Sequence, residues 1–364
     1  MSLKLAIISP NRNKYSETFI HGHIENLPFE IVLYSEGYLP TMLSQDKGLS
    51  FTELSTRKKW WKTSSPEKEF KNSLEEQRPD VVLAEYGVSG VEVMNTCKEL
   101  KIPLVVHFHG YDAYRNDVMA NQGEHYSELF EIAQAVVAVS KDMREQLIVL
   151  GCPKAKVHLI PYGIDCTQFM LSNAKGMKFV SCGRFVEKKG PLKTIHAFKT
   201  VVDQFPNAQL VMIGDGELLQ QAKELVRSLE LENNIEFAGV CSRSQIVEIY
   251  RDARVYVQHS MTTQENDREG TPLSILEASA SGLAVVATKH EGIKEAVQHE
   301  VTGILVEEGD VEAMGHAMLR LAEETTLASE MGKKGRIHIE KEYSYERYLG
   351  QLSELIRNCC IEKQ

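Results

Sequence analysis

The sequence lacks the cysteine spacing of a zinc-binding or disulfide-rich protein. Its 364 residues contain seven cysteines but no C-x-x-C pair, and the adjacent Cys359 and Cys360 lie near the C-terminus. This distribution argues against a zinc ribbon and a disulfide framework. No apolar run has the length of a membrane span, and the run from Leu5 to Pro10 is too short for a secretory signal. We therefore expect a cytoplasmic protein.

Excess positive charge is also missing. The formal net charge is -10 and the isoelectric point is near 5.7, which disfavours a nucleic-acid partner. An anionic ligand must then be met by a local cluster of Arg and Lys. The length and a hydrophobic content of 43% are sufficient for two domains, each with its own core.

Two common nucleotide-binding motifs are incomplete or absent. Gly214-x-Gly216 follows an apolar run, but the third glycine of the dinucleotide-binding fingerprint is missing. The P-loop pattern Gly-x-x-x-x-Gly-Lys-Ser/Thr does not occur. The sequence therefore disfavours a Rossmann dehydrogenase and a P-loop NTPase. Internal repeats of 20–50 residues and low-complexity segments are also absent.

Short apolar runs alternate with helical patterns along the first part of the chain. This alternation predicts an open α/β domain with a mostly parallel sheet. Ser140 is placed to cap a helix over Lys141–Leu150, which Gly151 ends. The expected strands are Leu3–Ser9, Ile31–Tyr34, Val81–Glu85, Leu104–Phe108, Ala135–Val139 and Val157–Ile160.

A polar stretch that ends at Met177 separates this part from a second α/β pattern. We expect domains over residues 1–166 and 167–344, followed by a C-terminal helical segment over residues 345–364. The second domain is expected to be doubly wound as well. Its expected strands are Lys178–Cys182, Leu210–Ile213, Ile235–Phe237, Val255–Gln258, Ala284–Ala287 and Gly303–Val306.

The stretch Glu269-Gly-Thr-Pro-Leu-Ser-Ile-Leu-Glu277 places two carboxylates around a loop that turns into a helix. Pro272 suits the first helical position, and Thr271 before it is placed to cap the helix. Unpaired amides at such a helix start face an anion favourably.

A second loop, Gly183-Arg-Phe-Val-Glu-Lys-Lys-Gly190-Pro191, follows a predicted strand and precedes a predicted helix. Arg184 can place two donors on diphosphate oxygens, and Lys189 adds a positive charge. Gly190 lets the backbone approach a ligand closely. We predict that this loop binds phosphate, without any need for a metal ion. The predicted helix has apolar positions at Leu192, Ile195, Phe198 and Val202.

Together with the small-residue helix, the strand after Gly282 and the motif Glu291-Gly292-Ile-Lys-Glu295, the Glu269–Glu277 stretch resembles the retaining glycosyltransferases of family four, also called glycosyl transferases group 1. The resemblance implies the GT-B fold, in which two doubly wound Rossmann-like domains face a central cleft. It implies transfer of a sugar from a nucleotide-sugar donor to a hydroxyl acceptor with retained anomeric configuration. No cofactor or metal is expected, and the C-terminal helix is expected to pack back on the first domain.

The resemblance also implies roles for individual residues. Glu269 and the amides of the following residues would hold hydroxyls of the donor sugar, and Glu277 would accept hydrogen bonds from the nucleotide ribose. The expected catalytic residues are His109, Arg184, Lys189 and Glu269. The expected donor-binding residues are Gly214, Gly216, Gly270, Thr271, Leu273 and Glu277.

Two histidines end the predicted strand Leu104–Phe108. Strand alternation places His107 and His109 on the same side, and the family pattern selects His109 as the contact to the donor sugar. A His-x-His pair also suits a metal ion, although no third ligand stands at useful spacing in the sequence.

Two further segments give weaker predictions. Ser16 and Glu17 lie in an N-terminal loop that departs from the commonest family pattern, and we expect them to border the acceptor site. The segment Arg57-Lys58-Lys59-Trp60-Trp61-Lys62 combines positive charge with aromatic rings. It suits peripheral contact with the inner face of an anionic membrane, packing in the first domain, or stacking on a sugar.

Several alternatives stay open at the level of sequence. The same architecture hosts nucleotide-sugar epimerases and phosphorylases, and a non-catalytic nucleotide-sugar-binding protein would use the same cleft. The resemblance favours a transferase with a sugar or lipid-linked acceptor in polysaccharide or glycolipid assembly. The base and sugar of the donor are not determined by these residues.

Overall fold

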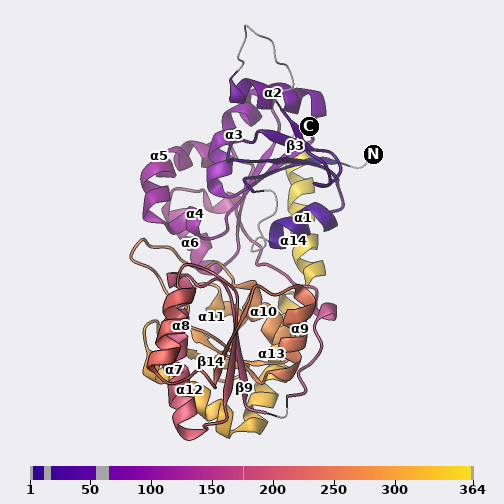
Figure 1. Cartoon of the computed structure of the whole chain (residues 1–364). Helices are drawn as coiled ribbons and strands as arrows, with labels where there is room; N and C mark the ends of the chain where they lie inside the picture. Colours follow the sequence, from indigo (N-terminus) through magenta and orange to yellow (C-terminus); the bar gives the residue numbers. More distant parts are fainter. Residues whose placement is uncertain (1–2, 12–17, 55–64, 175, 362–364) are drawn as a thin grey trace. The chain divides into compact units, whose positions relative to one another are not determined.

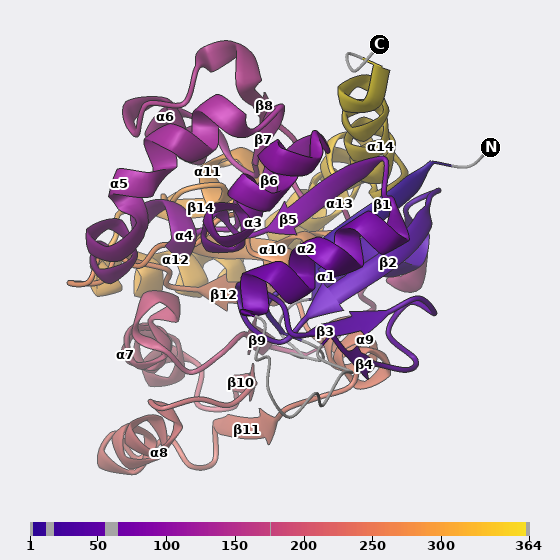
Figure 2. The ribbon, with the colours of Figure 1, turned by 90° about the horizontal axis from the view of Figure 1, so that it is seen from above.

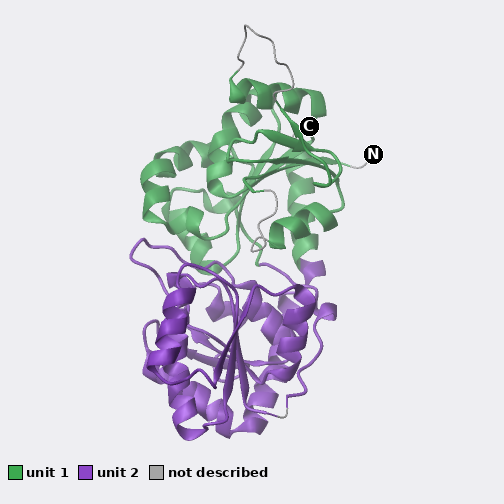
Figure 3. Cartoon of the chain, in the orientation of Figure 1, with its two compact units in different colours: residues 1–161, 348–364 green, residues 162–347 purple. Residues whose placement is uncertain are grey.

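The computed structural model describes residues 3–11, 18–54, 65–174 and 176–361. It divides into two compact units, which Figure 3 distinguishes by colour. The first unit takes its residues from Met1–Pro161 and Tyr348–Gln364, and the second from Tyr162–Arg347. Each unit contains its own β-sheet, so each is described separately.

The described residues of the first unit form an eight-stranded sheet in the order β4-β3-β2-β1-β5-β6-β7-β8, which can be followed in Figure 2. Six of these strands are parallel to one another, namely β2, β1, β5, β6, β7 and β8. The strands β3 and β4 form an antiparallel edge. Their bounds are β1 Lys4–Ser9, β2 Glu30–Ser35, β3 Met42–Ser44, β4 Thr52–Glu53, β5 Val81–Glu85, β6 Leu104–His107, β7 Ala135–Ala138 and β8 Val157–Leu159.

The helices of the first unit follow most of the strands, as expected for crossover connections between parallel strands (Figure 1). The N-terminal cap of α6 is as predicted, because the Ser140 side chain accepts from the N–H of Met143 at 3.1 Å. The helices are α1 Thr18–Asn26, α2 Pro66–Gln77, α3 Gly87–Leu100, α4 Tyr111–Tyr114, α5 Asn116–Ile132, α6 Lys141–Val149 and most of α14 Tyr345–Ile361.

The second unit contains a six-stranded parallel sheet within the described residues, in the order β11-β10-β9-β12-β13-β14. Strand order reverses between β9 and β12, and in doubly wound sheets this switch point is where a crevice forms at the carboxyl ends of the strands. The strands are β9 Lys178–Cys182, β10 Gln209–Ile213, β11 Ile235–Gly239, β12 Val255–Gln258, β13 Ala284–Thr288 and β14 Gly303–Val306.

Helices pack against this sheet through apolar side chains. In α7 the buried face includes Ile195 and Phe198, as predicted, while Leu192 and Val202 are partly buried against the same core. The helices are α7 Pro191–Gln204, α8 Leu219–Ser228, α9 Arg243–Asp252, α10 Leu273–Ala280, α11 Ile293–Ala296, α12 Val311–Glu323 and α13 Thr325–Glu342. The predicted α/β class with two parallel-sheet domains is confirmed.

Residues 162–166 lie with the second unit, although the sequence pattern assigns them to the first domain. The reason is local pairing: the N–H of Ile164 donates to the carbonyl of Tyr343 at 2.9 Å, and Ile164 forms a β-bridge with Ser344. From Tyr348 onward, α14 belongs to the first unit and lies beside α1, where Tyr348 contacts His23 (Figure 1). The chain therefore returns to the first unit at its end.

None of the described helices combines the length and the apolar composition that crossing a membrane requires.

Candidate active site

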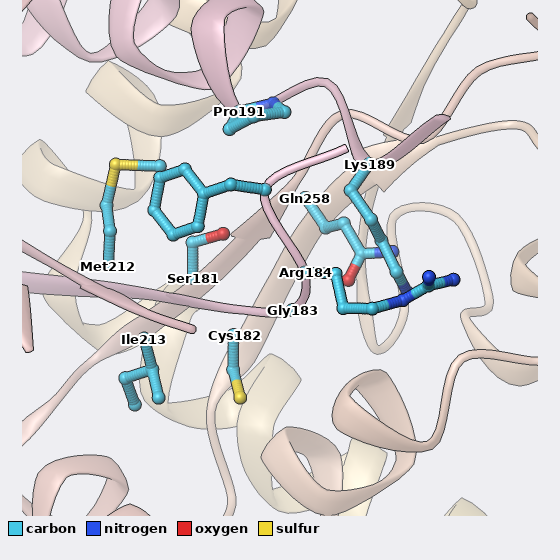
Figure 4. Close-up of a pocket in the computed structure, with 10 residues that line it drawn as sticks. Ser181, Cys182, Gly183, Arg184, Lys189, Pro191, Met212, Ile213 and Gln258 are labelled. Carbon is cyan, nitrogen blue, oxygen red and sulfur yellow. The ribbon is translucent and has the colours of Figure 1, made fainter. Parts of the chain in front are cut away.

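A pocket lies at the switch point of the second sheet, and Figure 4 shows its lining. The ends of β9, β10 and β12 contribute to it, together with the loop after β9. Arg184 and Lys189 from that loop line the same pocket as Gln258 of β12. The lining residues are Ser181, Cys182, Gly183, Arg184, Phe185, Lys189, Pro191, Met212, Ile213 and Gln258. The predicted phosphate-binding loop thus lies where a doubly wound sheet places its ligand.

The loop that carries Arg184 rests on the turn after β10. The N–H of Gly183 donates to the carbonyl of Ile213 at 3.0 Å, and the N–H of Phe185 donates to the carbonyl of Asp215 at 2.9 Å. Gly214 has φ +129°, and a Cβ atom there would lie 2.0 Å from the carbonyl oxygen of Gly183. Only glycine fits this position, since the two backbone segments touch. Gly216 lies in the same turn, against Phe185.

Arg184 is half-buried and makes no ion pair with any carboxylate of the described residues. Its neighbour in the pocket, Lys189, folds across Gly183, so closely that a Cβ atom added to this glycine would lie 3.4 Å from Lys189 Cδ. Gly190 closes this loop with φ +54° and leads into α7. The pocket therefore presents one guanidinium that is available to an anion.

Lys189 pairs with Glu269, which comes from the loop between β12 and α10. Lys189 Nζ lies 2.9 Å from Glu269 Oε2, while Glu269 Oε1 is buried without a hydrogen-bond partner among the described residues. Burial opposes ionisation of Glu269, but Lys189 and the neighbouring Lys188 outweigh it and lower the carboxyl pKa to about 2. Glu269 is therefore an ionised acceptor with one oxygen unused.

Lys188 reinforces this link between the two loops, a role that the sequence pattern did not indicate. Its Nζ atom lies 2.9 Å from Asp267 Oδ1 and 3.3 Å from the carbonyl oxygen of Arg268. Its own carbonyl accepts from the N–H of Met261 at 2.9 Å. The only sequence signal was its position in a Lys-Lys pair, which does not say which lysine turns inward.

The start of α10 differs from the prediction. The helix begins at Leu273, Pro272 is the N-cap with extended ψ of 116°, and no side chain caps it, so Thr271 is not the cap. Gly292 explains why, since its Cα lies so close that a Cβ would be 2.2 Å from Thr271 Oγ1. The carbonyl of Gly270 accepts from the Gly292 N–H at 3.1 Å. Thr271 is thus packed against the loop after β13.

Glu277 lies on α10 and is almost completely buried. Burial raises the pKa of its carboxyl, and the nearby Arg243 guanidinium opposes this rise only in part. Arg243 Nη2 lies 3.3 Å from Glu277 Oε1, and the same guanidinium sits 5.4 Å from the centre of the Phe169 ring. The sequence pattern did not identify Arg243, which is a single basic residue at the first position of α9.

His109 belongs to a buried cluster in the first unit. Its Nε2 atom lies 2.8 Å from Oε2 of Glu85, and Oε1 of Glu85 lies 2.6 Å from Nδ1 of His23. The second ring nitrogen of His23 contacts the hydroxyl of Tyr348 on α14. Burial opposes ionisation of Glu85, but His23 and His109 outweigh it and hold the carboxyl pKa well below its usual range.

The ring of His109 is packed on several sides. It stacks on Phe19 and on His107, each at a centroid distance of 4.4 Å, and it meets Tyr86 edge-on at 4.5 Å. Its backbone N–H donates to Asp112 Oδ1 at 3.0 Å. The side chain is only 3% exposed, so its position is set by its neighbours.

The structure supplies the third candidate metal ligand that the sequence spacing did not reveal. Ligand atoms of Glu85, His107 and His109 all lie within 4.8 Å of one another. The two imidazole planes are nearly parallel, at 7°, and stacked. Ring-nitrogen lone pairs lie in the ring plane, so stacked rings direct them side by side and not toward one tetrahedral centre. This geometry suits packing better than metal coordination.

The remaining predicted residues lie outside the described part of the chain. These are Ser16 and Glu17 at the expected acceptor site and the basic aromatic segment Arg57, Lys58, Lys59, Trp60, Trp61 and Lys62. Glu85, by contrast, is described and was missed. Its signal was a charged residue at the end of the otherwise apolar strand Val81–Glu85.

Two family models match adjoining parts of the chain. Glycosyltransferase Family 4 matches residues 25–168, and Glycosyl transferases group 1 matches residues 168–338. The first covers most of the N-terminal sheet, and the second contains both loops that meet at Lys189 and Glu269.

Curated relatives are glycosyltransferases. The amylovoran biosynthesis glycosyltransferase AmsK of Erwinia amylovora is 29% identical over 284 residues, which is 76% of this chain and 70% of that protein. The UDP-Gal:α-D-GlcNAc-diphosphoundecaprenol α-1,3-galactosyltransferase of Escherichia coli is 24% identical over 312 residues, covering 80% and 78% of the two chains.

Solved structures share the fold at lower identity. Anabaena HepE in complex with UDP superposes with a TM-score of 0.80 at 17% identity and covers 98% of this chain and 100% of its own. Sucrose-phosphate synthase from Thermosynechococcus elongatus also superposes with a TM-score of 0.80, at 19% identity, and the match covers 99% of this chain and 100% of that chain. The chain therefore belongs to the group 1 glycosyltransferases of family four and is a transferase with the GT-B fold.

Proposed function

We propose that this glycosyltransferase takes its sugar from a nucleotide-sugar donor, transfers it to a hydroxyl acceptor with retained anomeric configuration, and needs no metal ion. The observation that supports this most directly is the pairing of Lys189 with Glu269 beside Arg184. Lys189 and Glu269 come from the two loops that, in the resembled family, hold the diphosphate and the sugar. Arg184 stays available for phosphate oxygens.

The chemistry follows from these charges. When the bond between the sugar and the diphosphate breaks, negative charge accumulates on the departing diphosphate. Arg184 and Lys189 are fixed cations at the carboxyl edge of the sheet, where they stabilise that charge without reorganisation. A single fixed donor of this kind lowers a barrier by ~3–4 kcal/mol. The leaving group is thus stabilised by side chains of the protein itself.

On the sugar side, the unused Oε1 of Glu269 is an acceptor for a hydroxyl of the transferred sugar. Glu277 is proposed to accept from the ribose hydroxyls, in competition with Arg243. His109 is proposed to orient the donor sugar. The proposed mechanism uses same-face displacement, because no residue is identified as a nucleophile for a covalent glycosyl intermediate.

The setting is proposed from the relatives. AmsK acts in amylovoran biosynthesis, and the galactosyltransferase acts on a diphosphoundecaprenol-linked sugar, as their names state. We therefore propose polysaccharide or glycolipid assembly, with a sugar or lipid-linked acceptor. Residues 57–62 would bring the enzyme to the cytoplasmic face of an anionic membrane.

The donor proposal is tested by a thermal-shift panel of UDP, GDP, ADP and their sugars, with and without EDTA, on the wild type and Arg184→Ala. Ligands that bind the folded state raise its melting temperature. We expect one nucleotide series to stabilise the wild type equally with and without EDTA, and the shift to be lost in the variant. Shifts that vanish with EDTA would overturn metal independence.

The transfer itself is tested with the series identified in that panel. Incubation with candidate acceptors, followed by NMR of the product, gives the anomeric configuration directly. Retention supports the proposal and inversion contradicts it. Binding of a nucleotide sugar without transfer to any hydroxyl acceptor, together with conversion of the sugar itself, would favour an epimerase.

A further inference from the structure

One pair of side chains, Glu308 and His290, holds both ends of the loop between β12 and α10. At the start of the loop, the N–H of Thr262 donates to Glu308 Oε2 at 2.8 Å. At its end, the N–H of Glu269 donates to His290 Nε2 at 3.0 Å. His290 Nδ1 lies 2.5 Å from Glu308 Oε1, which joins the two anchors.

The partners of His290 determine which ring nitrogen carries the proton. A backbone N–H only donates, so Nε2 must present its lone pair to Glu269. Burial opposes ionisation of Glu308, but the hydrogen bonds from His290 and Thr262 hold its carboxyl pKa below the usual value. An ionised carboxylate only accepts, so Nδ1 carries the hydrogen. The ring is therefore neutral and in the Nδ1–H tautomer.

This anchor serves a backbone N–H that has no second acceptor among the residues that the structure describes. Glu269 precedes α10 by several residues, so its N–H lies outside the hydrogen-bond ladder of the helix. The residue is buried, and a buried N–H without an acceptor is costly. Without His290, the backbone at Glu269 would shift toward another acceptor, and the carboxylate would move away from Lys189.

We propose that His290, held by Glu308, is a positioning residue that sets Glu269 for the donor sugar; this rests on the proposed function. His290 is 1% exposed and does not itself reach a ligand. It acts through the backbone of Glu269. The nucleotide part of the donor is expected to depend on Arg184 and not on this anchor.

The variants follow from the donor and acceptor pattern. His290→Ala removes the acceptor for the Glu269 N–H. His290→Gln offers a carboxamide oxygen near the former Nε2 position and is expected to restore most of the function. Glu308→Gln keeps one acceptor oxygen but turns the other into an NH₂ donor, which then opposes either Thr262 or His290.

His299 provides a matched control in the same unit. Its Nδ1 atom accepts from the N–H of Leu305 at 3.0 Å, so it is also a histidine that anchors a backbone amide. It precedes β14, at the amino end of the strand, whereas the pocket lies at the carboxyl ends of β9, β10 and β12. His299→Ala removes the same kind of bond without affecting Glu269.

The first measurement uses the unliganded protein and does not depend on the reaction. Nitrogen-15 NMR of the His290 ring reports its tautomer, and hydrogen exchange reports protection of the Glu269 amide. We expect the Nδ1–H form in the wild type, and loss of amide protection in His290→Ala but not in His299→Ala. The Nε2–H form, or an amide protected equally in His290→Ala, overturns the inference.

The second measurement compares binding of the nucleoside diphosphate and the nucleotide sugar of the series that stabilises the wild type. His290→Ala should weaken binding of the nucleotide sugar by roughly tenfold and that of the diphosphate by less than about twofold. His290→Gln should recover most of the loss, and Glu308→Gln should show an intermediate one. His299→Ala should bind both ligands like the wild type.

The outcomes separate the two proposals. Equal weakening of both ligands, or no recovery in His290→Gln, overturns the positioning role even where the tautomer is as expected. A wild type that binds no nucleotide sugar overturns the proposed function and, with it, the role of His290 toward the sugar. In that case the NMR and exchange results still decide whether the anchor itself exists.

Discussion

The ammonium group of Lys189 lies 2.9 Å from Oε2 of Glu269, although 80 positions separate the two residues in the sequence. The pair joins the loop after β9 to the loop before α10. It leaves Arg184 as the neighbouring cation without a carboxylate partner among the described residues. The ion pair therefore links the two loops of the proposed donor site within one unit.

Removing the lysine should reduce turnover. Lys189→Met is expected to lower kcat by roughly 100-fold, because it removes one fixed positive charge from the departing diphosphate. Steady-state kinetics at saturating donor measures this effect. Lys199→Met is the control, since Lys199 forms an exposed pair with Asp203 on α7. An equal loss in both variants would contradict the assignment.

The same pair predicts a pH dependence of stability. The pKa of Glu269 is lowered from 4.5 to about 2 in the folded protein, so its ionised form stabilises the fold above about pH 4.5. That contribution is lost as the pH falls toward 2. The difference in unfolding free energy between the wild type and Glu269→Gln should therefore shrink below about pH 4.5. In the Lys189→Met background, this decrease with falling pH should be smaller. A stability difference with the same pH dependence in both backgrounds would contradict the prediction.

Close backbone contact at Gly214 predicts a large effect from a single methyl group. Gly214→Ala places Cβ against the carbonyl of Gly183 and should lower the unfolding free energy by ~3 kcal/mol or more. Binding of the nucleoside diphosphate should be lost, since Arg184 moves with Gly183. Gly309→Ala is the control, because Gly309 has φ +84° but a Cβ added there would have no described atom within 4 Å. It should cost only about 1 kcal/mol and leave binding intact.

Much of the fold could be predicted from local patterns, and the reasons are physical. Strands such as Val255–Gln258 are buried on both faces and therefore form apolar runs that are visible in sequence. The strands β3 and β4 at the antiparallel edge of the first sheet were missed because they have only three and two residues; β4 is exposed, and β3 is partly buried apart from the buried Ser44. Such segments contain too few apolar positions to show a period.

The positions of candidate site residues could be predicted where they follow from residue type in a local motif, but not where they depend on long-range packing. Glycine and basic residues after β9 indicated an anion site, and the structure places Arg184 and Lys189 in one pocket. His290 and Glu85 were missed, because Glu269 lies 21 positions from His290, His23 lies 62 positions from Glu85, and no short motif connects either pair. The start of α10 was misplaced because tertiary packing on Gly292 overrides the local capping preference of Thr271.

Glu85 is expected to be a major source of stability in the first unit. Glu85→Gln should lower the unfolding free energy by about 3 kcal/mol at neutral pH, because it breaks a buried pair that has two histidine partners. Chemical denaturation measures the change. The effect should diminish as the pH falls below about 4.5, since the folded-state pKa is lowered and the ionised form provides the stability. Glu99→Gln, at an exposed pair with Lys71, should change the free energy by less than about 1 kcal/mol.

Replacing Glu277, unlike replacing Glu85, should weaken binding without lowering stability. Its folded-state pKa is raised by burial, so ionisation costs stability as the pH rises above about 4.5. Glu277→Gln should therefore be at least as stable as the wild type at pH 7, while binding of the nucleoside diphosphate weakens by roughly tenfold. Denaturation and calorimetric titration test both parts. Unaltered binding would exclude Glu277 as the proposed acceptor for ribose.

The hydroxyl of Tyr348 on α14 completes the buried His23–Glu85 cluster, across 325 positions of sequence. During synthesis, the N-terminal sheet leaves the ribosome long before this helix does, and the whole second unit is made in between. Until then, His23 lacks one of its native hydrogen-bond partners. Final consolidation of the N-terminal half must therefore wait until α14 has been made, so a nascent chain arrested before α14 should be open to proteolysis around α1.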